Sequence, residues 1–400
     1  MNGAVQTVCH IITKLELGGA QQNTLFTLSH LDPSRFRAVL ITGEPGMLDR
    51  EAEALPGVDF HQVLTMVRPL RPWRDLRALV SLTLLLRTLK PEIVHTHSSK
   101  AGVLGRLAAW FAGVPIIIHT IHGFGLTPHQ HPLIRHALLA MERIVARVTT
   151  RFFAVSEASR WQGVHLRLFP ADRCAVIRSG VDLAAFRQAR VDVKAKKQEL
   201  GLGPAGPVVG MIAPFKPQKA PLDFVRMAEL VHRARPDAQF LLVGDGELRG
   251  VVEVALARLG LSSRTRLTGW RRDVPEIMRC LDVFVLTSLW EGLPRVYLEA
   301  LASGVPVVGT RVDGAGEVVR DGLTGFLTEP GDVRALAERV LHVLAHPEEA
   351  NRMGRNGQAL PLEFDIHEMV RKQECEYDRL LASLLGKREY RKPCKSPYLT

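Results

Sequence analysis

The stretch from Leu281 to Arg311, LDVFVLTSLWEGLPRVYLEALASGVPVVGTR, decides the fold of this 400-residue chain. Asp282 to Thr287 is a short apolar, β-branched run, typical of a strand buried on both faces of a parallel sheet. A turn with Gly and Pro follows, then a helical apolar pattern over about 295–303 that Gly304 ends, and then a second buried strand. The pattern predicts a βαβ unit whose loop lies where open α/β sheets bind ligands.

This unit carries two carboxylates, Glu291 in the loop and Glu299 in the helix, and three interpretations are open. The first is a pair of solvated surface charges, the usual state of Glu. The second is a glycosidase acid/base pair, which is disfavoured because nothing in the sequence buries one carboxylate and raises its pKa. The third is a pair of hydrogen-bond acceptors for sugar hydroxyls, next to a helix N-terminus that suits a diphosphate.

The run from Glu291 to Glu299, EGLPRVYLE, and the following ALASGVPVV resemble the Glu-x7-Glu signature of retaining glycosyltransferases with the GT-B fold (family 4, glycosyltransferase group 1). Asp313-Gly-Ala-Gly-Glu317 and Asp321 to Phe326 continue the resemblance, which covers nearly the whole chain. It implies an α/β protein with two Rossmann-like, doubly wound parallel-sheet domains that face a cleft, and a C-terminal helix that crosses back to the first domain.

The length suits two domains of ordinary size, and 46% hydrophobic residues are enough for two cores. We expect an acceptor-side N-terminal domain at 1–190 and a nucleotide-sugar-binding C-terminal domain at 207–364. A crossing helix at 365–386 and a basic tail at 387–400 would follow. The five Cys show no Cys-x-x-Cys spacing, which argues against a zinc site.

A Gly pair, Gly18-Gly19, separates the first strand from the first helix. Such a pair lets a ligand or another backbone come close, and by itself it is as common in tight packing as in binding. The resemblance places this loop against the donor diphosphate and the acceptor, with Gln21 on the acceptor side. The G-x-G-x-x-G pattern is incomplete, so a nicotinamide enzyme is not indicated.

Four histidines, His95, His97, His119 and His122, follow or end two neighbouring strands. They could form a metal site, but they lack a supporting carboxylate, and hydrogen-bonded cleft histidines are the alternative. The resemblance puts His122 beside the donor sugar and gives His97 an acceptor-side role. We expect no bound metal and no cofactor; the nucleotide-sugar is a substrate.

Lys216 and Lys219 follow a strand and precede a helix, which suits a pyrophosphate as well as it suits solvated lysines. The family usually has an Arg where this chain has Pro214, and Lys216 is the nearby substitute. By the resemblance His122, Glu291 and Lys219 are catalytic, and Glu299 holds the ribose. The remaining donor-binding residues are Gly244, Gly246, Gly269, Trp270, Gly292, Leu293 and Pro294.

The resemblance implies a retaining enzyme that moves a sugar from a nucleotide-sugar, expected to be UDP-linked, to a glycan or lipid-linked acceptor in surface polysaccharide or glycolipid synthesis. A nucleotide-sugar 2-epimerase and a non-catalytic sugar-nucleotide-binding protein are the alternatives. Release of free nucleotide, as against formation of an epimer, distinguishes the first alternative from the expected enzyme.

The positive charge is concentrated in the first half of the chain. Residues 1–190 carry 22 Lys/Arg and 13 Asp/Glu, against 30 and 28 in residues 191–400. No nucleic-acid motif is present, so nucleic acid is not an expected partner. Arg68, Arg71, Arg74 and Arg77 flank Trp73 ahead of an apolar helix, which suits either an anionic membrane or an ordinary packed helix. With no secretory signal or membrane span evident, we expect a cytoplasmic protein at the inner face of the membrane.

Overall fold

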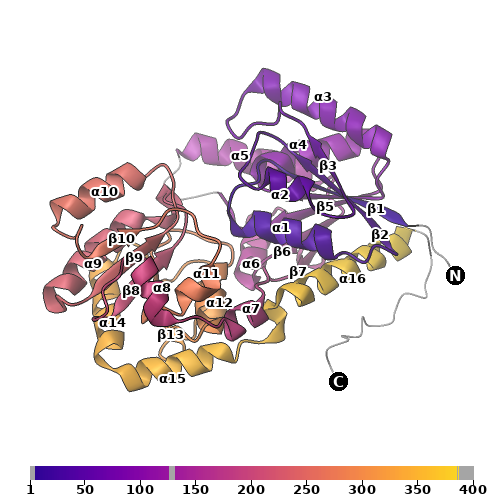
Figure 1. Cartoon of the computed structure of the whole chain (residues 1–400). Helices are drawn as coiled ribbons and strands as arrows, with labels where there is room; N and C mark the ends of the chain where they lie inside the picture. The colour runs from indigo at the N-terminus through magenta and orange to yellow at the C-terminus, as the bar shows by residue number, and fades with distance from the viewer. Residues whose placement is uncertain (1–4, 126–130, 385, 387–400) are drawn as a thin grey trace. The chain divides into compact units, whose positions relative to one another are not determined.

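The computed structural model describes residues 5–125, 131–384 and 386. These residues form two compact units: unit 1 comprises those up to Gly180 together with those from Ile366 onward, and unit 2 comprises 181–365 (Figure 1). The second unit thus begins at Val181, before the end expected for the first domain at residue 190, and residues 191–206, which lie between the two expected domains, also belong to it. The basic tail expected at 387–400 lies outside the described residues.

Unit 1 is built on a seven-stranded parallel sheet with the order β3-β2-β1-β4-β5-β6-β7. Because the chain winds first to one side of β1 and then to the other, the strand order reverses between β1 and β4, which makes this the topological switch point. The strands are β1 Gln6–Ile12, β2 Phe36–Thr42, β3 Val58–Gln62, β4 Ile93–His97, β5 Ile116–Ile121, β6 Arg151–Ala154 and β7 Cys174–Val176.

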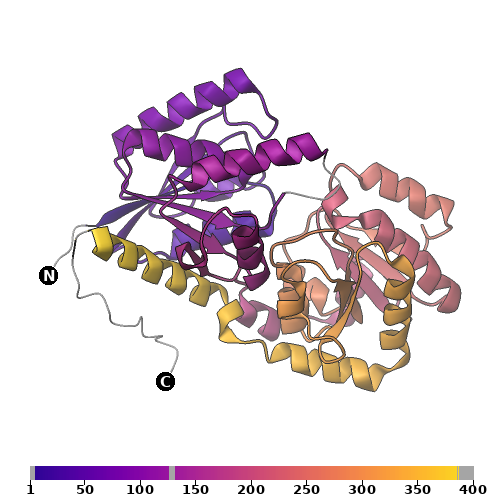
Figure 2. The same ribbon diagram turned by 180° about the vertical axis from the view of Figure 1, so that it is seen from behind.

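Helices cover both faces of this sheet (Figure 1). On one face α1 Gly19–His30 and α16 Ile366–Leu384 pack on alternate strand residues such as Val8 and Ile12. On the other face α3 Pro72–Leu89 and α4 Ser99–Ala112 pack on the intervening residues, such as Cys9 and Ile11. The remaining helices of this unit are α2 Asp49–Glu53, α5 Pro132–Ala146, which contacts α4 and is seen from behind in Figure 2, and α6 Glu157–His165.

Unit 2 has a six-stranded parallel sheet with the order β10-β9-β8-β11-β12-β13 and its switch point between β8 and β11. The strands are β8 Val208–Ile212, β9 Gln239–Val243, β10 Thr265–Leu267, β11 Val283–Leu286, β12 Val307–Thr310 and β13 Gly325–Thr328. The helices are α7 Leu183–Gln188, α8 Val193–Glu199, α9 Pro221–Ala234, α10 Arg249–Arg258, α11 Val274–Met278, α12 Arg295–Ala302, α13 Ala315–Val318, α14 Val333–Ala345 and α15 Pro347–Gln358.

The predicted fold class is therefore confirmed. The stretch from Leu281 to Arg311 forms β11, α12 and β12. Gly304, at φ 78°, lies just after α12, where the helix was expected to end. The C-terminal helix also behaves as expected, because α16 follows unit 2 in the sequence but belongs to unit 1, where Met369, Tyr377 and Leu381 enter the core.

Candidate active site

Two loops meet at the switch point of unit 2. One follows β8 and ends in the 3-10 turn Pro217–Lys219; the other follows β11. The Thr287 hydroxyl donates a hydrogen bond to the Lys219 carbonyl at 2.8 Å, and the Gln218 side chain donates to the Trp290 carbonyl at 2.8 Å. The N–H of Leu289 donates to the Gln218 carbonyl at 2.8 Å. These bonds hold the two loops against each other and fix where Lys219 lies.

An ion pair between Lys219 and Glu291 bridges these loops. The side chains are 14% and 9% exposed, so both charges are largely removed from water. The Ser288 hydroxyl also donates to Glu291 Oε1, at 2.5 Å. A desolvated pair is stable only when its remaining lone pairs and protons are satisfied, and the additional bond from Ser288 serves that purpose. The structure thus brings together two predicted catalytic residues that lie 72 positions apart.

Asp313 supports Glu291 through the backbone. Its carboxylate accepts a hydrogen bond from the Glu291 N–H at 2.8 Å. Its φ of 34° is unusual for a non-glycine residue and indicates that the surrounding structure imposes the conformation. Burial raises the pKa of this carboxyl. Our sequence prediction did not include Asp313 as a site residue, because a contact between a side chain and a backbone N–H 22 positions away leaves no local pattern.

Glu299 lies one turn into α12 and faces Arg295, with 3.8 Å between Oε1 and Nη2. Burial raises the pKa of Glu299, and the Arg295 guanidinium opposes that rise. One premise of the sequence argument was therefore wrong: the glycosidase interpretation was disfavoured because no carboxylate seemed to be buried, whereas Glu299 is half-buried and Glu291 is 8% exposed.

The glycine turns expected to line a nucleotide base come together at the ends of β9 and β10. The N–H of Gly244 donates to the Gly269 carbonyl at 2.9 Å, and Trp270, half-buried, follows directly. Gly244 has φ 132°, and a Cβ there would lie 2.1 Å from the Ala213 carbonyl oxygen. Glycine is therefore required for the backbone at this point, whatever it binds. Gly246, with φ 156°, lies two residues further along the same turn.

The other predicted donor-side residues border the ion pair. Lys216 is half-buried and immediately precedes the 3-10 turn. Gly292 accepts a backbone hydrogen bond from Gly314 at 3.2 Å, which joins the Glu291 loop to the loop after β12. Leu293 and Pro294 are buried and lead into α12.

In unit 1 the predicted Gly pair begins α1. Gly18 is the N-cap residue and Gly19 the first helical residue, and both are half-exposed. A Cβ on Gly18 would lie 2.6 Å from Oε1 of Gln21, whose amide donates to the Lys14 carbonyl at 3.3 Å. The Gly pair and Gln21 are thus brought together at the N-terminus of α1.

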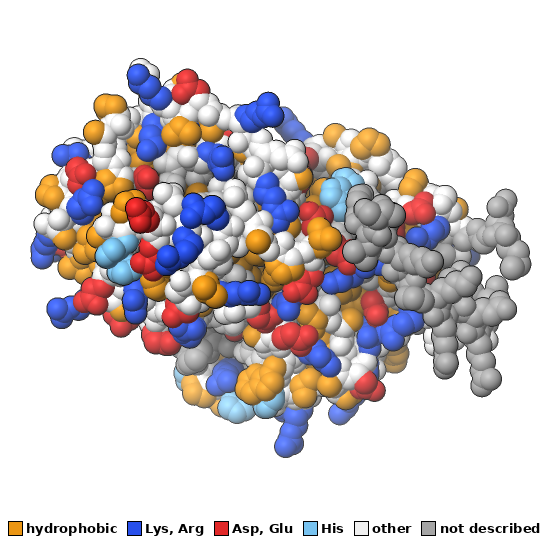
Figure 3. Space-filling model, turned by 90° about the horizontal axis from the view of Figure 1, so that it is seen from below, with side chains coloured by type: hydrophobic (Ala, Val, Ile, Leu, Met, Phe, Trp, Pro, Cys, Tyr) orange, Lys and Arg blue, Asp and Glu red, His pale blue; other side chains and the backbone are white. Residues whose placement is uncertain are grey.

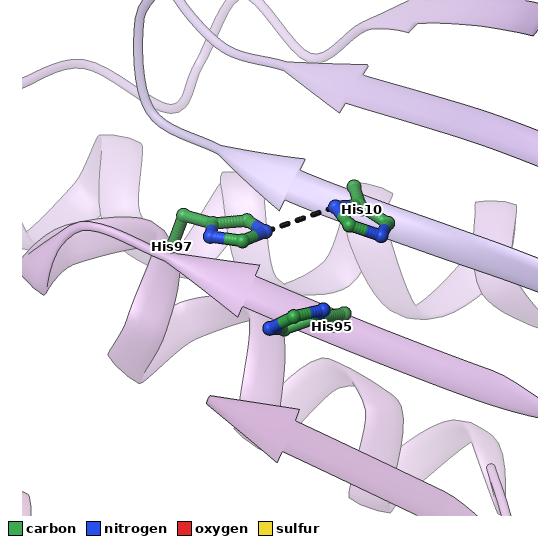
Figure 4. Close-up of side chains that lie close together, drawn as sticks. All are labelled: His10, His95 and His97. Carbon is green, nitrogen blue, oxygen red and sulfur yellow. Dashed lines mark hydrogen bonds between the residues drawn. The ribbon is translucent and has the colours of Figure 1, made fainter. Parts of the chain in front are cut away.

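The histidines of unit 1 separate onto the two faces of the sheet according to the two-residue period of a strand. His95, His97 and the following His122 lie on the α1/α16 side, together with His10 of β1, which contacts His97 (Figure 4). His119 lies on the other side and bonds to Thr96 at 2.9 Å. The four histidines considered in the sequence therefore do not form one cluster: His119 lies apart from the other three, and His10, which was not among them, joins them.

A continuous chain of hydrogen bonds links these rings. His122 Nε2 lies 3.0 Å from His97 Nδ1, and His97 Nε2 lies 2.9 Å from His10 Nδ1. Tyr377 of α16 contacts His10 Nε2 at 3.2 Å and His95 Nδ1 at 2.6 Å, and His95 Nε2 lies 2.6 Å from Thr120 Oγ1. Within the described residues, His10, His95 and His97 each use both ring nitrogens in such bonds.

Three of these rings could also suggest a metal site, since ligand nitrogens of His10, His95 and His97 lie within 4.8 Å of one another. A metal ion would have to displace the hydrogen bonds that already use those lone pairs. We therefore favour the hydrogen-bonded interpretation, and the absence of a required metal stays a prediction. His97 is 3% exposed, and its two ring nitrogens bond to His122 and His10. It therefore supports His122 from inside the protein.

A small cavity with both polar and apolar lining residues borders this network. Its volume of about 20 Å³ is enough for one water molecule. His97, His122 and Ser179 line it, together with Asn23 of α1, whose side-chain amide has no hydrogen-bond partner among the described residues. The predicted His122 thus lies beside an uncharged, hydrogen-bonding recess.

Comparison with known proteins identifies the family. Residues 206–346 match the family described as Glycosyl transferases group 1, and residues 17–185 match Glycosyltransferase Family 4. The chain is 34% identical over 339 residues to the Escherichia coli UDP-Gal:alpha-D-GlcNAc-diphosphoundecaprenol alpha-1,3-galactosyltransferase, covering 84% of this chain and 87% of that protein. The chain belongs to the group 1, family 4 glycosyltransferases.

Further relatives agree with this assignment. The 2-deoxystreptamine N-acetyl-D-glucosaminyltransferase of Streptomyces fradiae is 31% identical, over 80% of this chain and 81% of the relative. The crystal structure of Anabaena Alr3699/HepE in complex with UDP and glucose superposes with a TM-score of 0.81 at 22% identity, covering 94% of this chain and all of that one. WaaG, a glycosyltransferase involved in lipopolysaccharide biosynthesis, gives a TM-score of 0.75 at 16% identity, over 92% of this chain and 98% of that one.

The protein is therefore an enzyme that transfers glycosyl groups, with the GT-B fold. The comparisons support this activity over the epimerase, the glycosidase and the non-catalytic alternatives. None of the described helices combines the length and the apolar character needed to cross a bilayer.

Proposed function

We propose that this glycosyltransferase moves a hexose from a UDP-sugar to a lipid-diphosphate-linked glycan and retains the anomeric configuration. The observation that carries the proposal is the Lys219–Glu291 ion pair across the switch point of unit 2. It offers a cation for a diphosphate and a carboxylate for sugar hydroxyls on adjacent loops. The E. coli relative, named as a UDP-Gal-dependent enzyme with a diphosphoundecaprenol acceptor, supports the choice of substrates.

Lys219 has three N–H donors, so it can keep its bond to Glu291 and still donate to a phosphate oxygen. As the bond from the sugar C1 to the diphosphate oxygen breaks, negative charge grows on that oxygen, and Lys219 stabilises it. The acceptor oxygen attacks C1 from the same face and gives its proton to the departing diphosphate. Glu291, held by Ser288 and by its own N–H to Asp313, fixes the sugar through its hydroxyls.

Unit 1 presents the acceptor side in this proposal. His122 and the Gly18-Gly19 loop lie at the carboxyl ends of its strands, where a doubly wound sheet binds ligands. The side chains there include imidazoles, hydroxyls and amides, which suit sugar hydroxyls, and the charged Lys14 and Glu16 of the same loop pair with each other at 4.0 Å.

The partner surface that we propose is an anionic bilayer, and α3 supports this. Ala78, Leu82 and Leu86 form its buried side, whereas Trp73, Leu76, Val80 and Leu84 follow helical spacing on the outer side and are 51–80% exposed. An apolar stripe facing water next to arginines is typical of a helix that lies on a membrane. Arg71, Arg74 and Arg77 are exposed, and none of them forms an ion pair with the described residues, whereas Arg68 pairs with Glu16 at 3.1 Å.

A second outward stripe lies on α5, which the sequence prediction passed over. Ile134, Met141 and Ile144 follow helical spacing and are 45–57% exposed, and Leu133 is 74% exposed. The view from below, on the side away from α3, shows hydrophobic, acidic and basic side chains interspersed (Figure 3). The apolar stripes beside arginines thus favour the α3 and α5 side for lipid contact.

The experiment is a transfer assay with the full chain, a panel of UDP-hexoses and a GlcNAc-diphosphate-lipid acceptor. We expect UDP release that depends on acceptor and a product whose anomeric proton shows the donor's configuration by NMR. Lys219→Ala serves as the inactive control. An inverted product would overturn the retaining mechanism, and transfer only to lipid-free acceptors would overturn the acceptor class.

A further inference from the structure

The histidine chain of unit 1 has a direction, which can be derived from its distances. A neutral imidazole has one N–H donor and one acceptor nitrogen, so a ring bonded at both nitrogens donates on one side and accepts on the other. The tautomer of each ring is therefore determined by its neighbour, from Tyr377 to His122.

Tyr377 has a single hydroxyl proton and three possible acceptors, which are His95, His10 and, at 3.4 Å, Oε1 of Gln373. Its oxygen lies 2.6 Å from His95 Nδ1 and 3.2 Å from His10 Nε2. A short O–H···N bond is the stronger one, so the proton points to His95. His10 Nε2 must then carry its own proton and donate to the Tyr377 oxygen.

The remaining bonds follow in order. Since His10 Nε2 holds the proton, His10 Nδ1 accepts from His97 Nε2 at 2.9 Å. His97 Nδ1 in turn accepts from His122 Nε2 at 3.0 Å. His122 is thereby fixed as the Nε2–H tautomer, in which Nδ1 can only accept a hydrogen bond.

The chain works only while its rings are neutral, because an imidazolium would set one N–H against another. Burial lowers the pKa of His10 to about 3 and holds the pKa values of His95 and His97 well below their usual value, with neighbouring histidines adding to the effect for the latter two. In the described part of the chain, the core side chains that surround Tyr377 on the α1 and α16 side of the sheet are mainly apolar, such as Ile118, Phe153 and Met369.

We propose that Tyr377, on the C-terminal helix, is a positioning residue that sets the tautomer of His122 through His10 and His97. The proposal rests on the proposed role of His122 beside the sugar. It gives α16 a function beyond packing: the last helix of the chain determines which nitrogen of a residue at the edge of the sheet accepts a hydrogen bond.

Tyr377→Phe removes the hydroxyl that imposes this direction at the α16 end of the chain of rings. His10 Nε2 would lose its acceptor, so the chain can reverse: His10 Nδ1–H would donate to His97, and His97 Nδ1–H would donate to His122 Nε2. His122 would then carry its proton on Nδ1. Each ring keeps one proton, so no charge is gained or lost.

The test is nitrogen NMR of the full chain labelled with ¹⁵N-histidine, with the His122 signals assigned from their loss in His122→Gln. The wild type should show His122 as the Nε2–H tautomer, and Tyr377→Phe should shift it toward Nδ1–H. Tyr297→Phe is the matched control, since Tyr297 is a fully buried tyrosine of unit 2 whose hydroxyl donates to the Leu286 carbonyl. It should leave the His122 signals unchanged.

Turnover gives the second readout. We expect Tyr377→Phe to lower kcat about tenfold, the effect of one hydrogen bond, with KM for the donor little changed. His10→Phe, which interrupts the chain at another point, should give the same spectral change if Tyr377→Phe does not fold. A His122 that stays Nε2–H in both variants would overturn the proposal, and so would a changed tautomer with wild-type kcat. Because the NMR needs no substrate, it stands even if the proposed reaction fails.

Discussion

The two units share a sheet architecture, but they differ in the side chains at the switch point: those of unit 1 are neutral and those of unit 2 are charged. Between β1 and β4 of unit 1, the switch point holds neutral rings joined in a chain, with His10 on one strand and His97 on the other. Between β8 and β11 of unit 2, it holds a Lys–Glu ion pair in the loops that follow the strands.

Both sites are largely buried, and they differ in how polar groups are satisfied. The unit 1 rings lie between the sheet and α16, where an uncompensated charge would cost several kcal/mol, so they remain neutral and satisfy one another by hydrogen bonds. The charges of the unit 2 pair compensate each other, with a further bond from Ser288. A fold can therefore use one crevice to hold a neutral reactant and the other to hold a diphosphate.

The largest expected effect is a loss of stability in acid, and this loss should be larger in unit 1 than in unit 2. His10, His95, His97 and His119 have pKa values lowered by burial from the usual 6.5. Their contribution to stability is present above pH 6.5 and is lost as the pH falls below it, because only the unfolded chain takes up protons. At pH 5.5, one unit below that value, each histidine that stays neutral in the folded state costs about 1 kcal/mol, and the four together cost several kcal/mol.

Carboxyls whose pKa is raised by burial should respond in the opposite sense. Glu299 and Asp313 of unit 2 bind their protons more tightly in the folded state, so their contribution improves as the pH falls. Glu374 and Asp378 of α16 shift in the same direction and oppose the histidines of unit 1, but they are two groups against four. Hydrogen exchange followed by mass spectrometry between pH 7.5 and 5.5, corrected for intrinsic rates, should show protection lost in β1, β4 and β5 first. Equal loss in β8 and β11 would contradict the comparison.

Removing the cation from the unit 2 crevice should affect turnover most. We expect Lys219→Ala to lower kcat by at least ~100-fold, because the leaving diphosphate gains charge in the transition state. Steady-state assays of UDP release measure this. Lys194→Ala, an exposed lysine of the same unit, is the control and should keep wild-type kcat.

Lys216→Ala should cost nearly as much as Lys219→Ala if Lys216 replaces the Arg that the family usually has where this chain has Pro214. Wild-type turnover in this variant would show that Lys216 makes no such replacement.

The sequence predicted unit 2 better than unit 1 for a physical reason. The Glu291 and Glu299 signature lies within one βαβ unit, where local pattern and function coincide, and Lys219 follows a recognisable strand. The histidine chain instead depends on four elements, β1, β4, β5 and α16, that only the folded sheet brings together. His10 looked like one polar residue in a buried strand, and Tyr377 like one aromatic residue of an amphipathic helix.

What the sequence missed in unit 2 has the same origin. Asp313 holds Glu291 through a contact that depends on how the ends of β11 and β12 align in the sheet, and Ser288 holds it by a side-chain contact within the same loop. The glycine turns were predictable as turns, but the need for glycine at Gly244 comes from the Ala213 carbonyl, which belongs to a different strand connection.

A smaller effect is expected on nucleotide affinity. If Glu299 accepts from the ribose hydroxyls, Glu299→Gln should weaken UDP binding by about 1.5–3 kcal/mol, the value of a hydrogen bond to a charged group. Calorimetry with UDP measures the change in affinity. The fold should persist because the distance between Glu299 and Arg295, 3.8 Å, is long for an ion pair. Unchanged affinity would remove Glu299 from the site and leave Lys219 and Glu291 as the charged part of the crevice.

The smallest expected effect is that of a single arginine on membrane attachment, and it extends the comparison of the units to their surfaces. A basic side chain near an anionic bilayer contributes about 1 kcal/mol, and salt screens it within a Debye length. Arg74→Gln on α3 should therefore weaken binding to phosphatidylglycerol vesicles about fivefold at low salt. Arg68→Gln should do less, because its guanidinium already pairs with Glu16, and Arg258→Gln, an exposed arginine of unit 2, should do nothing. Vesicle sedimentation with the full chain measures all three variants. Equal losses of binding for Arg74→Gln and Arg258→Gln would mean that the net positive charge of the whole protein attracts the vesicle and that α3 makes no specific contact with lipid.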